Sequence, residues 1–342
     1  MRAKADKLGL QLRPHAKTHQ SAGVGEWFRE LGSRRITVSS VDMAAYFAEN
    51  GFTDITLAFP VNTREIERIN RLMESVSLHL LVEAEETVQF LNNKLSRPAD
   101  FFIKIDTGYH RAGLMWDDYE AIRRVAEAAR PEKLRFRGFL THDGRTYKAR
   151  GKEEVAAIHQ KNLNRFRQLK ALFQEDWPDI MVSYGDTPTA SLMEDFSAMD
   201  ELRPGNYVFY DLMQQQVGSC DYADIAVALA APVVAKHLAR NELVLYAGAV
   251  HLSKDSLQDP EYGTLFGKVA EYDETGWGDP YPGVYLSRLS QEHGIVKAPD
   301  AFMRKVQVGD LLLVLPVHSC LAADLMPGYL TLEGEWLPVM PK

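Results

Sequence analysis

From about residue 10 to residue 210, the chain alternates short runs typical of β-strands with longer amphipathic stretches. Helical stretches such as VDMAAYFAENG and EEVAAIHQKNLNRFRQLKALFQ separate these runs. The alternation predicts βαβ units and a parallel sheet. Eight strands with intervening helices predict a (β/α)8 TIM barrel, in which the catalytic groups lie just after the strands. The predicted strands are LQLRP near residue 11, RITVSS (35–40), DITLAF (54–59), SLHLLV (77–82), DFFIKI (100–105), LRFRGFL (134–140), DIMVSY (179–184) and ELRPGNYVFY (201–210).

After about residue 222 the pattern changes to apolar runs broken by Gly, Pro, Asp and Asn. IAVALAAPVVAKHL, ELVLYAGAV and DLLLVLPVHSC are examples, and they lack helical periodicity. This pattern predicts a second, mostly β domain. We therefore expect a barrel over residues 1–221 and a β domain over residues 222–342, packed together because no flexible linker separates them.

Composition narrows the class of protein. The chain has 342 residues, of which 46% are hydrophobic, enough for a barrel and a smaller module. Its net charge of -8 argues against a nucleic-acid partner, since such binding depends on clustered Lys and Arg. There is no apolar run of about 20 residues and no secretory signal, so we expect no membrane partner and a cytoplasmic location. Two cysteines, Cys220 and Cys320, are typical of a reducing compartment.

The first predicted strand ends in RPHAKTH, which contains Lys17. A lysine at a barrel mouth, partly desolvated and flanked by histidines, can have a lowered pKa and serve as a Schiff-base nucleophile and then as a base. The alternative is a solvated loop lysine.

Two further segments follow predicted strands. KIDTGYHRAG carries Arg111 between two glycines. The glycines would let a ligand approach the backbone closely, and the guanidinium of Arg111 could bind an anionic oxygen of that ligand. Alternatively, this segment is a turn with a surface ion pair.

YGDTPT carries Gly185 and Thr187 ahead of a helical segment, where a barrel often binds phosphate. An ordinary helix cap explains the same residues.

His318 and Cys320 follow the run DLLLVLPV. In an extended segment, residues i and i+2 point to one side, so an imidazole and a thiolate could bind one metal ion. Two protein ligands leave positions for substrate and water, as in a catalytic site. The alternative is a packed histidine beside a small buried thiol.

Together these segments resemble the fold-type III pyridoxal-phosphate (PLP) enzymes, and among them the D-serine dehydratase and D-threonine aldolase branch of the alanine racemase-like group. RPHAKTH, KIDTGYHRAG, LTHDGRTY (140–147), GDTPT, ELRPGNYVFYD and PVHSC occur in the family's order and span nearly the whole chain. Relatives begin with a further strand and helix, and Met1 falls inside that helix. We expect the missing strand to belong to the second domain, so that all eight barrel strands remain.

The resemblance implies roles for individual residues. Lys17 would carry PLP as a Schiff base, and Arg111 would approach the phenolic oxygen of the cofactor. His318 and Cys320 would bind a divalent ion beside the β-hydroxyl of the substrate. That ion is expected to be zinc, because a soft thiolate favours it, whereas related aldolases have Asp in place of the Cys. The remaining cofactor-binding residues would be His142, Tyr147, Gly185, Thr187 and Tyr210.

Two positions depart from the family pattern. Asp186 replaces a small hydroxyl residue in the phosphate loop, where an acid beside a dianion is unfavourable unless it points away. Arg145 stands where the family usually has His, so a shifted substrate preference is expected.

The reaction implied by the resemblance is dehydration of a D-3-hydroxyamino acid such as D-serine, giving a 2-oxo acid and ammonia. Lys17 would remove the α-proton, PLP would take up the charge, and the metal would activate the hydroxyl as a leaving group. Retro-aldol cleavage to glycine and an aldehyde is the nearest alternative, and racemisation is less favoured because it needs no metal. A non-catalytic PLP carrier is a third hypothesis, against which the long β domain argues. The family suggests a homodimer.

Overall fold

The computed structural model describes residues 1–273 and 276–342. The chain forms two compact units, Met1–Gly205 with Met340–Lys342, and Asn206–Val339. The expected boundary near residue 221 lies inside the second unit. Within the described residues, no helix is both long enough and apolar enough to cross a bilayer.

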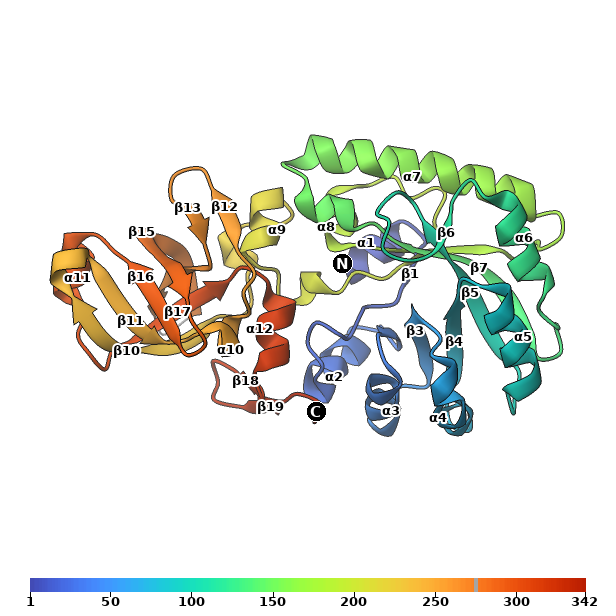
Figure 1. Ribbon diagram of the computed structural model, residues 1–342, viewed down its shortest axis with the longest axis horizontal. Helices are drawn as coiled ribbons and strands as arrows, with labels where there is room; N and C mark the ends of the chain where they lie inside the picture. Colours follow the sequence, from blue (N-terminus) through green and yellow to red (C-terminus); the bar gives the residue numbers. More distant parts are fainter. Residues whose placement is uncertain (274–275) are drawn as a thin grey trace. The chain divides into compact units, whose positions relative to one another are not determined.

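The first unit is built around a parallel sheet, as the alternating pattern predicts (Figure 1). Its strands follow the order β1-β9-β8-β7-β5-β4-β3-β2, and β6 (Leu114–Met115) pairs with β5 off this path. A parallel bridge between His15 and Thr37 joins the chain after β1 to β2, which brings the two ends of the sheet together. The strands are β1 (Gln11–Leu12), β2 (Arg35–Val38), β3 (Asp54–Pro60), β4 (Ser77–Val82), β5 (Ala99–Asp106), β7 (Leu134–His142), β8 (Met181–Gly185) and β9 (Glu201–Leu202).

Each predicted barrel strand is present, but the last is much shorter than expected. The pattern predicted a strand over residues 201–210, whereas β9 ends at Leu202. Pro204 has no N–H to donate to a sheet, and the chain then enters a 3-10 turn, η3 (Asn206–Val208). The (β/α)8 class is confirmed, with two strands, β1 and β9, that are each two residues long.

Helices follow most strands of this sheet. Side chains define several helix starts: Ser40 accepts a hydrogen bond from Met43 N–H, and Asp118 accepts one from Ala121 N–H. The helices are α1 (Arg2–Lys7), α2 (Ala22–Glu30), α3 (Val41–Glu49), α4 (Ile66–Leu72), α5 (Glu85–Lys94), α6 (Tyr119–Glu127), α7 (Lys152–Phe173) and α8 (Thr187–Leu192), with 3-10 turns η1 (Thr63–Glu65) and η2 (Gly144–Lys148).

The end of the chain returns to the first unit. Met340 N–H donates to the carbonyl of Gln20 at 2.7 Å, and the Gln20 side chain donates to the carbonyl of Lys17 at 3.2 Å. The lysine loop is therefore held partly by residues from the opposite end of the sequence.

The second unit is mostly β, as expected, and contains a closed antiparallel barrel. Its order is β10 (Leu229–His237), β11 (Glu242–Tyr246), β16 (His293–Lys297), β15 (Gly276–Leu289), β14 (Gly267–Asp273) and β17 (Leu311–Pro316). Two hairpins accompany it, β12 (Leu257–Asp259) with β13 (Gly263–Leu265), and β18 (Gly328–Leu330) with β19 (Trp336–Pro338). Its helical segments are α9 (Leu212–Val217), α10 (Ala249–Leu252), α11 (Asp300–Lys305) and α12 (Ser319–Leu325), with 3-10 turns η4 (Tyr222–Asp224) and η5 (Leu238–Arg240).

Candidate active site

The carboxyl ends of the parallel strands lie at one face of the first unit, here called the barrel mouth. Lys17 follows β1, Arg111 follows β5, His142 ends β7 and Gly185 ends β8. Parallel strands direct all these ends the same way, so residues far apart in the sequence reach one surface.

Lys17 lies in a loop fixed on both sides. The N–H of Ala16 donates to the carbonyl of Thr37 at 2.8 Å, which ties the loop to β2. Just before it, the buried Arg13 pairs with Glu201 at 2.7 Å. The Lys17 side chain itself is exposed, so the expected partial desolvation is not seen. The loop, and not burial of the amine, fixes the position of Lys17.

The two histidines that flank Lys17 differ in role. His19 packs between the rings of Phe28 and Phe47 and its Nδ1 lies 3.0 Å from the Ser21 carbonyl. Burial lowers the pKa of His19 to about 3, so it is a neutral core residue. His15 has a pKa well below its ordinary value because of burial and then the charge of Lys17. The expectation of two histidines beside the lysine therefore holds for His15 alone.

The barrel mouth carries several positive groups. Burial, followed by the charges of Arg203 and Arg111, lowers the pKa of Lys104 to about 7. The pKa of His142 is well below its ordinary value because of burial and the charges of Lys17, Lys104, Arg111 and Arg203. A surplus of positive charge in a partly dry site favours an anionic ligand.

Lys104 and Arg203 were not singled out by the sequence analysis. Lys104 is almost fully buried on β5, and Arg203 is equally buried after β9. Arg203 donates to the Ser183 hydroxyl at 2.6 Å and to the carbonyl of Thr141 at 2.5 Å. Lys104 lies in the segment KIDTGYHRAG and Arg203 in ELRPGNYVFYD. A charged residue in or next to a predicted apolar strand is the sequence signal that could have identified both.

The loop after β8 combines a helix cap with an available hydroxyl. Asp186 caps α8, accepting from Thr189 N–H at 2.7 Å and from Thr146 Oγ1 at 3.0 Å. Burial raises the pKa of Asp186 to about 6. Its carboxyl thus serves the helix cap. Thr187 N–H donates to the Tyr147 hydroxyl at 3.2 Å, so Tyr147 lies against the loop as the resemblance implies.

Space and hydrogen-bonding capacity in this loop suit a phosphate. Among the residues that the structure describes, the buried Thr187 Oγ1 has no hydrogen-bond partner. A side chain at Gly185 would place its Cβ 3.2 Å from the Arg203 guanidinium, so glycine keeps this approach open. A buried hydroxyl that can still donate, in a loop whose glycine lies against a guanidinium, is a favourable position for an anionic oxygen.

Arg145, the residue that departs from the family pattern, is held by protein groups. It pairs with Asp143 at 2.5 Å and donates to the carbonyl of Thr107 at 2.6 Å. Asp143 is fully buried and also accepts from Asn162 at 2.9 Å. The guanidinium therefore braces the segment that follows His142.

Tyr210 belongs to the second unit, by contrast with the other expected phosphate residues. Its N–H donates to the Asn206 carbonyl at 2.7 Å, its backbone has φ 50, and its side chain packs against the cluster of Leu212 and Ile225. Its role toward the phosphate stays a prediction.

His318 and Cys320 lie at the start of α12, in the second unit. The sequence analysis placed both in an extended segment, and this is wrong for Cys320. β17 ends at Pro316, His318 has the extended backbone of an N-cap residue, and Cys320 is in the first turn of the helix. The two side chains still interact, since Cys320 contributes to raising the pKa of His318. A helix N-terminus, and not a strand, brings the two donors together.

The neighbours of this pair are acidic. His318 Nδ1 lies 2.6 Å from Asp255 Oδ2, and Asn206 donates to Cys320 Sγ at 3.5 Å. Burial would lower the pKa of His318, but Asp255, Cys320 and Asp211 raise it to about 10. Within residues 1–273 and 276–342, no group of three or more His, Cys, Asp or Glu side chains is arranged to hold a metal.

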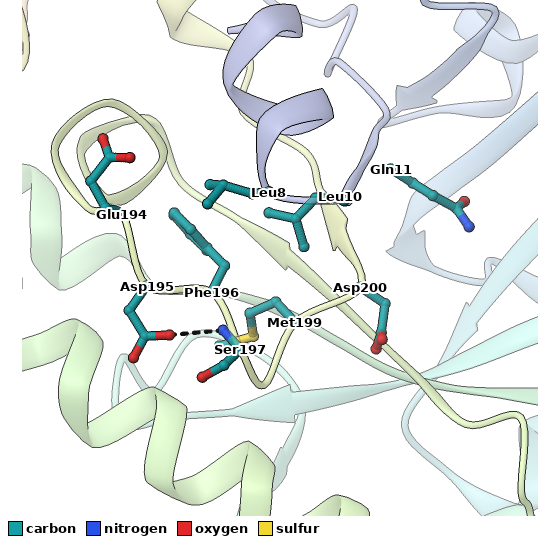
Figure 2. A pocket seen from close by; sticks show the side chains of 10 residues that line it. Leu8, Leu10, Gln11, Glu194, Asp195, Phe196, Ser197, Met199 and Asp200 are labelled. Carbon is teal, nitrogen blue, oxygen red and sulfur yellow. Dashed lines mark hydrogen bonds between the residues drawn. The ribbon is translucent and has the colours of Figure 1, made fainter.

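A cavity of about 520 Å³ lies elsewhere in the first unit. It is lined by residues 8–11, 194–197, 199 and 200, which lie at or just before the starts of β1 and β9 (Figure 2). The amino ends of barrel strands generally serve stability. This cavity therefore lies at the face away from the candidate site.

Comparisons with known proteins agree with this geometry. The family described as alanine racemase, N-terminal domain, matches residues 1–212, and the putative serine dehydratase domain matches residues 226–332. The D-threo-3-hydroxyaspartate dehydratase of Delftia sp. (strain HT23) is 28% identical over 98% of this chain and 90% of its own length. The D-serine dehydratase of Dictyostelium discoideum is also 28% identical, over 98% and 89%. The D-threonine aldolase of Arthrobacter sp. is more distant, at 22% over 93% and 80%.

The Delftia dehydratase is also similar in structure, with a TM-score of 0.91 at 27% identity over 99% of this chain and 92% of that one. Two further similar structures, each a D-threo-3-hydroxyaspartate dehydratase, carry a His-to-Ala substitution and a Cys-to-Ala substitution two positions later, the latter in the metal-free form.

The chain thus belongs to the alanine racemase-like family, with a serine dehydratase domain as its second part. It is a PLP-dependent lyase of the D-serine dehydratase-like branch.

Proposed function

We propose that this lyase dehydrates a D-3-hydroxyamino acid such as D-serine, with Lys17 as the cofactor lysine and zinc bound by His318 and Cys320. The His318–Cys320 pair is the observation that carries the choice of dehydration. The two substituted D-threo-3-hydroxyaspartate dehydratase structures identify a His and a Cys with the same spacing, and the Cys-to-Ala variant is in the metal-free form. A thiolate donor favours zinc over manganese or magnesium.

The residues of the barrel mouth fit PLP. Its phosphate and phenolic oxygen are anionic, and the mouth presents Lys104, Arg111 and Arg203. The Thr187 hydroxyl, which lacks a partner among the described residues, and the Tyr147 hydroxyl would hold the phosphate in the loop of Gly185. Arg111 would face the phenolic oxygen, and His142 would contact the cofactor as a neutral imidazole.

The chemistry then divides between the two sites. PLP, when bound, supplies a ring that withdraws electrons from the substrate Cα. Lys17 Nζ would take the Cα proton, which the exposed side chain on a fixed loop allows. The donors His318 and Cys320 would hold an ion that polarises the β-hydroxyl as a Lewis acid. A site with His318 and Cys320 as its protein donors would leave room for a substrate oxygen and water.

A substrate panel tests the proposal. Purified protein with PLP and zinc is incubated with D-serine, D-threo-3-hydroxyaspartate, D-threonine and L-serine. We expect a 2-oxo acid and ammonia from at least one of the three D-substrates and none from L-serine. Glycine and an aldehyde as the main products from D-threonine would instead assign the aldolase activity, and bound PLP without turnover of any substrate would assign a carrier.

A further inference from the structure

The imidazole of His318 has two nitrogens, and one of them, Nδ1, faces a carboxylate. Nδ1 lies 2.6 Å from Asp255 Oδ2. When one ring nitrogen of a histidine donates its hydrogen to a carboxylate, the other is left as the donor to a metal, and the ring orientation is fixed. The Asp255 contact therefore decides which nitrogen of His318 is available.

The loop that carries Asp255 is held in an uncommon conformation. It begins at Ser253, directly after α10, where the backbone has φ 66 and ψ -173. Non-glycine residues rarely adopt this region, and they keep it only where the surrounding structure holds them there. The Ser253 hydroxyl accepts the N–H of Asp255 at 3.1 Å, which fixes the start of the residue that reaches His318.

The Cys320 side of the pair has separate support. Asn206 donates both to Cys320 Sγ and to Asp211 Oδ2, the latter at 2.6 Å. Asp211 is fully buried and accepts the N–H of Ser319 at 2.9 Å. Cys320 is thus braced from the start of the second unit, whereas His318 depends on Asp255 from the α10–β12 loop.

We propose that Asp255 is a positioning residue for the metal: it accepts the Nδ1 hydrogen of His318 and directs Nε2 to the ion. The inference rests on the proposed metal site. The side chains of His318 and Asp255 remain 28% and 37% exposed, so the contact is not part of the buried core and its loss should leave the fold intact.

Zinc affinity tests this role. The PLP-loaded protein is titrated with zinc against a chromophoric chelator, comparing wild type with His318→Ala, Asp255→Ala and Asp255→Asn. Asp255→Ala should weaken zinc binding by roughly 10- to 100-fold, the usual effect of losing a carboxylate behind a histidine ligand. Asp255→Asn keeps an acceptor oxygen and should lose less. Asp259→Asn is the matched control, because Asp259 pairs with Lys268 at 3.0 Å a few residues along the chain.

A second readout separates positioning from direct coordination. In the cobalt-substituted protein, the Asp255→Ala spectrum should keep its thiolate-to-metal band, because Cys320 still binds, and X-ray absorption should count the same number of protein donors. Loss of an oxygen donor in Asp255→Ala would make Asp255 a direct ligand and overturn the inference. Equal zinc affinity in Asp255→Ala and Asp259→Asn would also overturn it, while leaving the metal site standing. If His318→Ala binds zinc as wild type does, the metal site itself is wrong.

Discussion

The barrel mouth and the start of α12 have opposite electrostatic character. At the mouth, the charges of neighbouring cations lower the pKa values of Lys104 and His142 beyond the effect of burial. At the start of α12, Asp255, Cys320 and Asp211 raise the pKa of His318 against the effect of burial. The first region therefore favours an anion and the second a cation. Electrostatic attraction alone would therefore direct an anionic cofactor to the barrel mouth and a metal cation to the start of α12, before any specific contact forms.

The largest expected effect is at the cationic region. Lys17→Ala should remove both the visible absorbance band of bound PLP and 2-oxo acid production, because no other exposed amine is expected at that position of the mouth. Absorbance spectra and borohydride labelling measure this, and Lys161→Met, an exposed lysine on α7, is the control that keeps both. Labelling of Lys104 instead of Lys17 would show that the cofactor is attached to β5 and would contradict the assignment of Lys17.

The next effect separates the two regions. Cys320→Ala, or treatment with a chelator, should lower 2-oxo acid production on the order of 10³-fold, since Lewis-acid activation of a leaving group is worth several kcal/mol. The PLP band should remain, because the barrel mouth is unchanged. Cys320→Asp is expected to shift the metal preference toward manganese.

Cys220→Ala is the matched control for that experiment. Burial raises the pKa of Cys220 to about 12, so this second cysteine stays a thiol and should be dispensable. Full activity of the metal-free protein would leave His318 and Cys320 as packing residues.

A smaller effect tests the phosphate loop. Thr187→Val should weaken PLP binding by about 1 kcal/mol, roughly 5-fold, while the Tm of the cofactor-free protein stays the same or rises. The reason is that Thr187 Oγ1 is buried and, among the described residues, lacks a partner until a ligand arrives. Tyr210→Phe should weaken PLP retention by a similar amount. Unchanged PLP affinity in both variants, measured by fluorescence titration, would place the phosphate elsewhere.

The smallest effect concerns the energetic cost of the cationic mouth. The pKa of Lys104 is about 7 in the folded chain, against an ordinary value of 10.5. Between pH 7 and 10.5 the unfolded chain binds a proton that the folded chain lacks, so this residue makes unfolding free energy rise with pH. Lys104→Met should therefore raise the Tm of the cofactor-free protein by a few degrees below pH 7.

That gain should shrink as the pH rises from 7 to 10.5 and vanish above 10.5, where both states of the wild-type chain hold a neutral amine. Lys161→Met should show no such pH dependence. A gain that is independent of pH would mean that packing, and not charge, sets the difference.

The barrel could be predicted from the sequence because its signals are local. Each of the eight strands is a short apolar run. Apolar residues recur every two residues in a strand and about every 3.6 residues in a helix, so a few consecutive residues are enough to tell the two apart. The largest difference is the early end of β9, which follows from Pro204. Proline lacks the N–H that a strand needs for pairing, and the pattern of apolar residues carries no information about that missing donor.

The site was predicted unevenly for the same reason. Lys17, Arg111 and His318 stand in short recognisable segments, whereas the chemistry of Lys104 and Arg203 arises from burial among neighbours on other strands. Asp255 lies 63 residues from His318 in the sequence, so no motif joins them. His19 is the opposite case: it lies two residues from Lys17 in the sequence, but in the fold its ring packs into the core against Phe28 and Phe47.

The return of Met340–Lys342 to the first unit makes the second unit an insertion in the topological sense. A barrel cut off after Gly205 would lose the hydrogen bond from Met340 to Gln20, and with it one support of the loop that holds Lys17. A circular permutant that begins at Met340 and continues through a linker into Met1 would keep that bond without the second unit. The isolated barrel should therefore be studied in the permuted form.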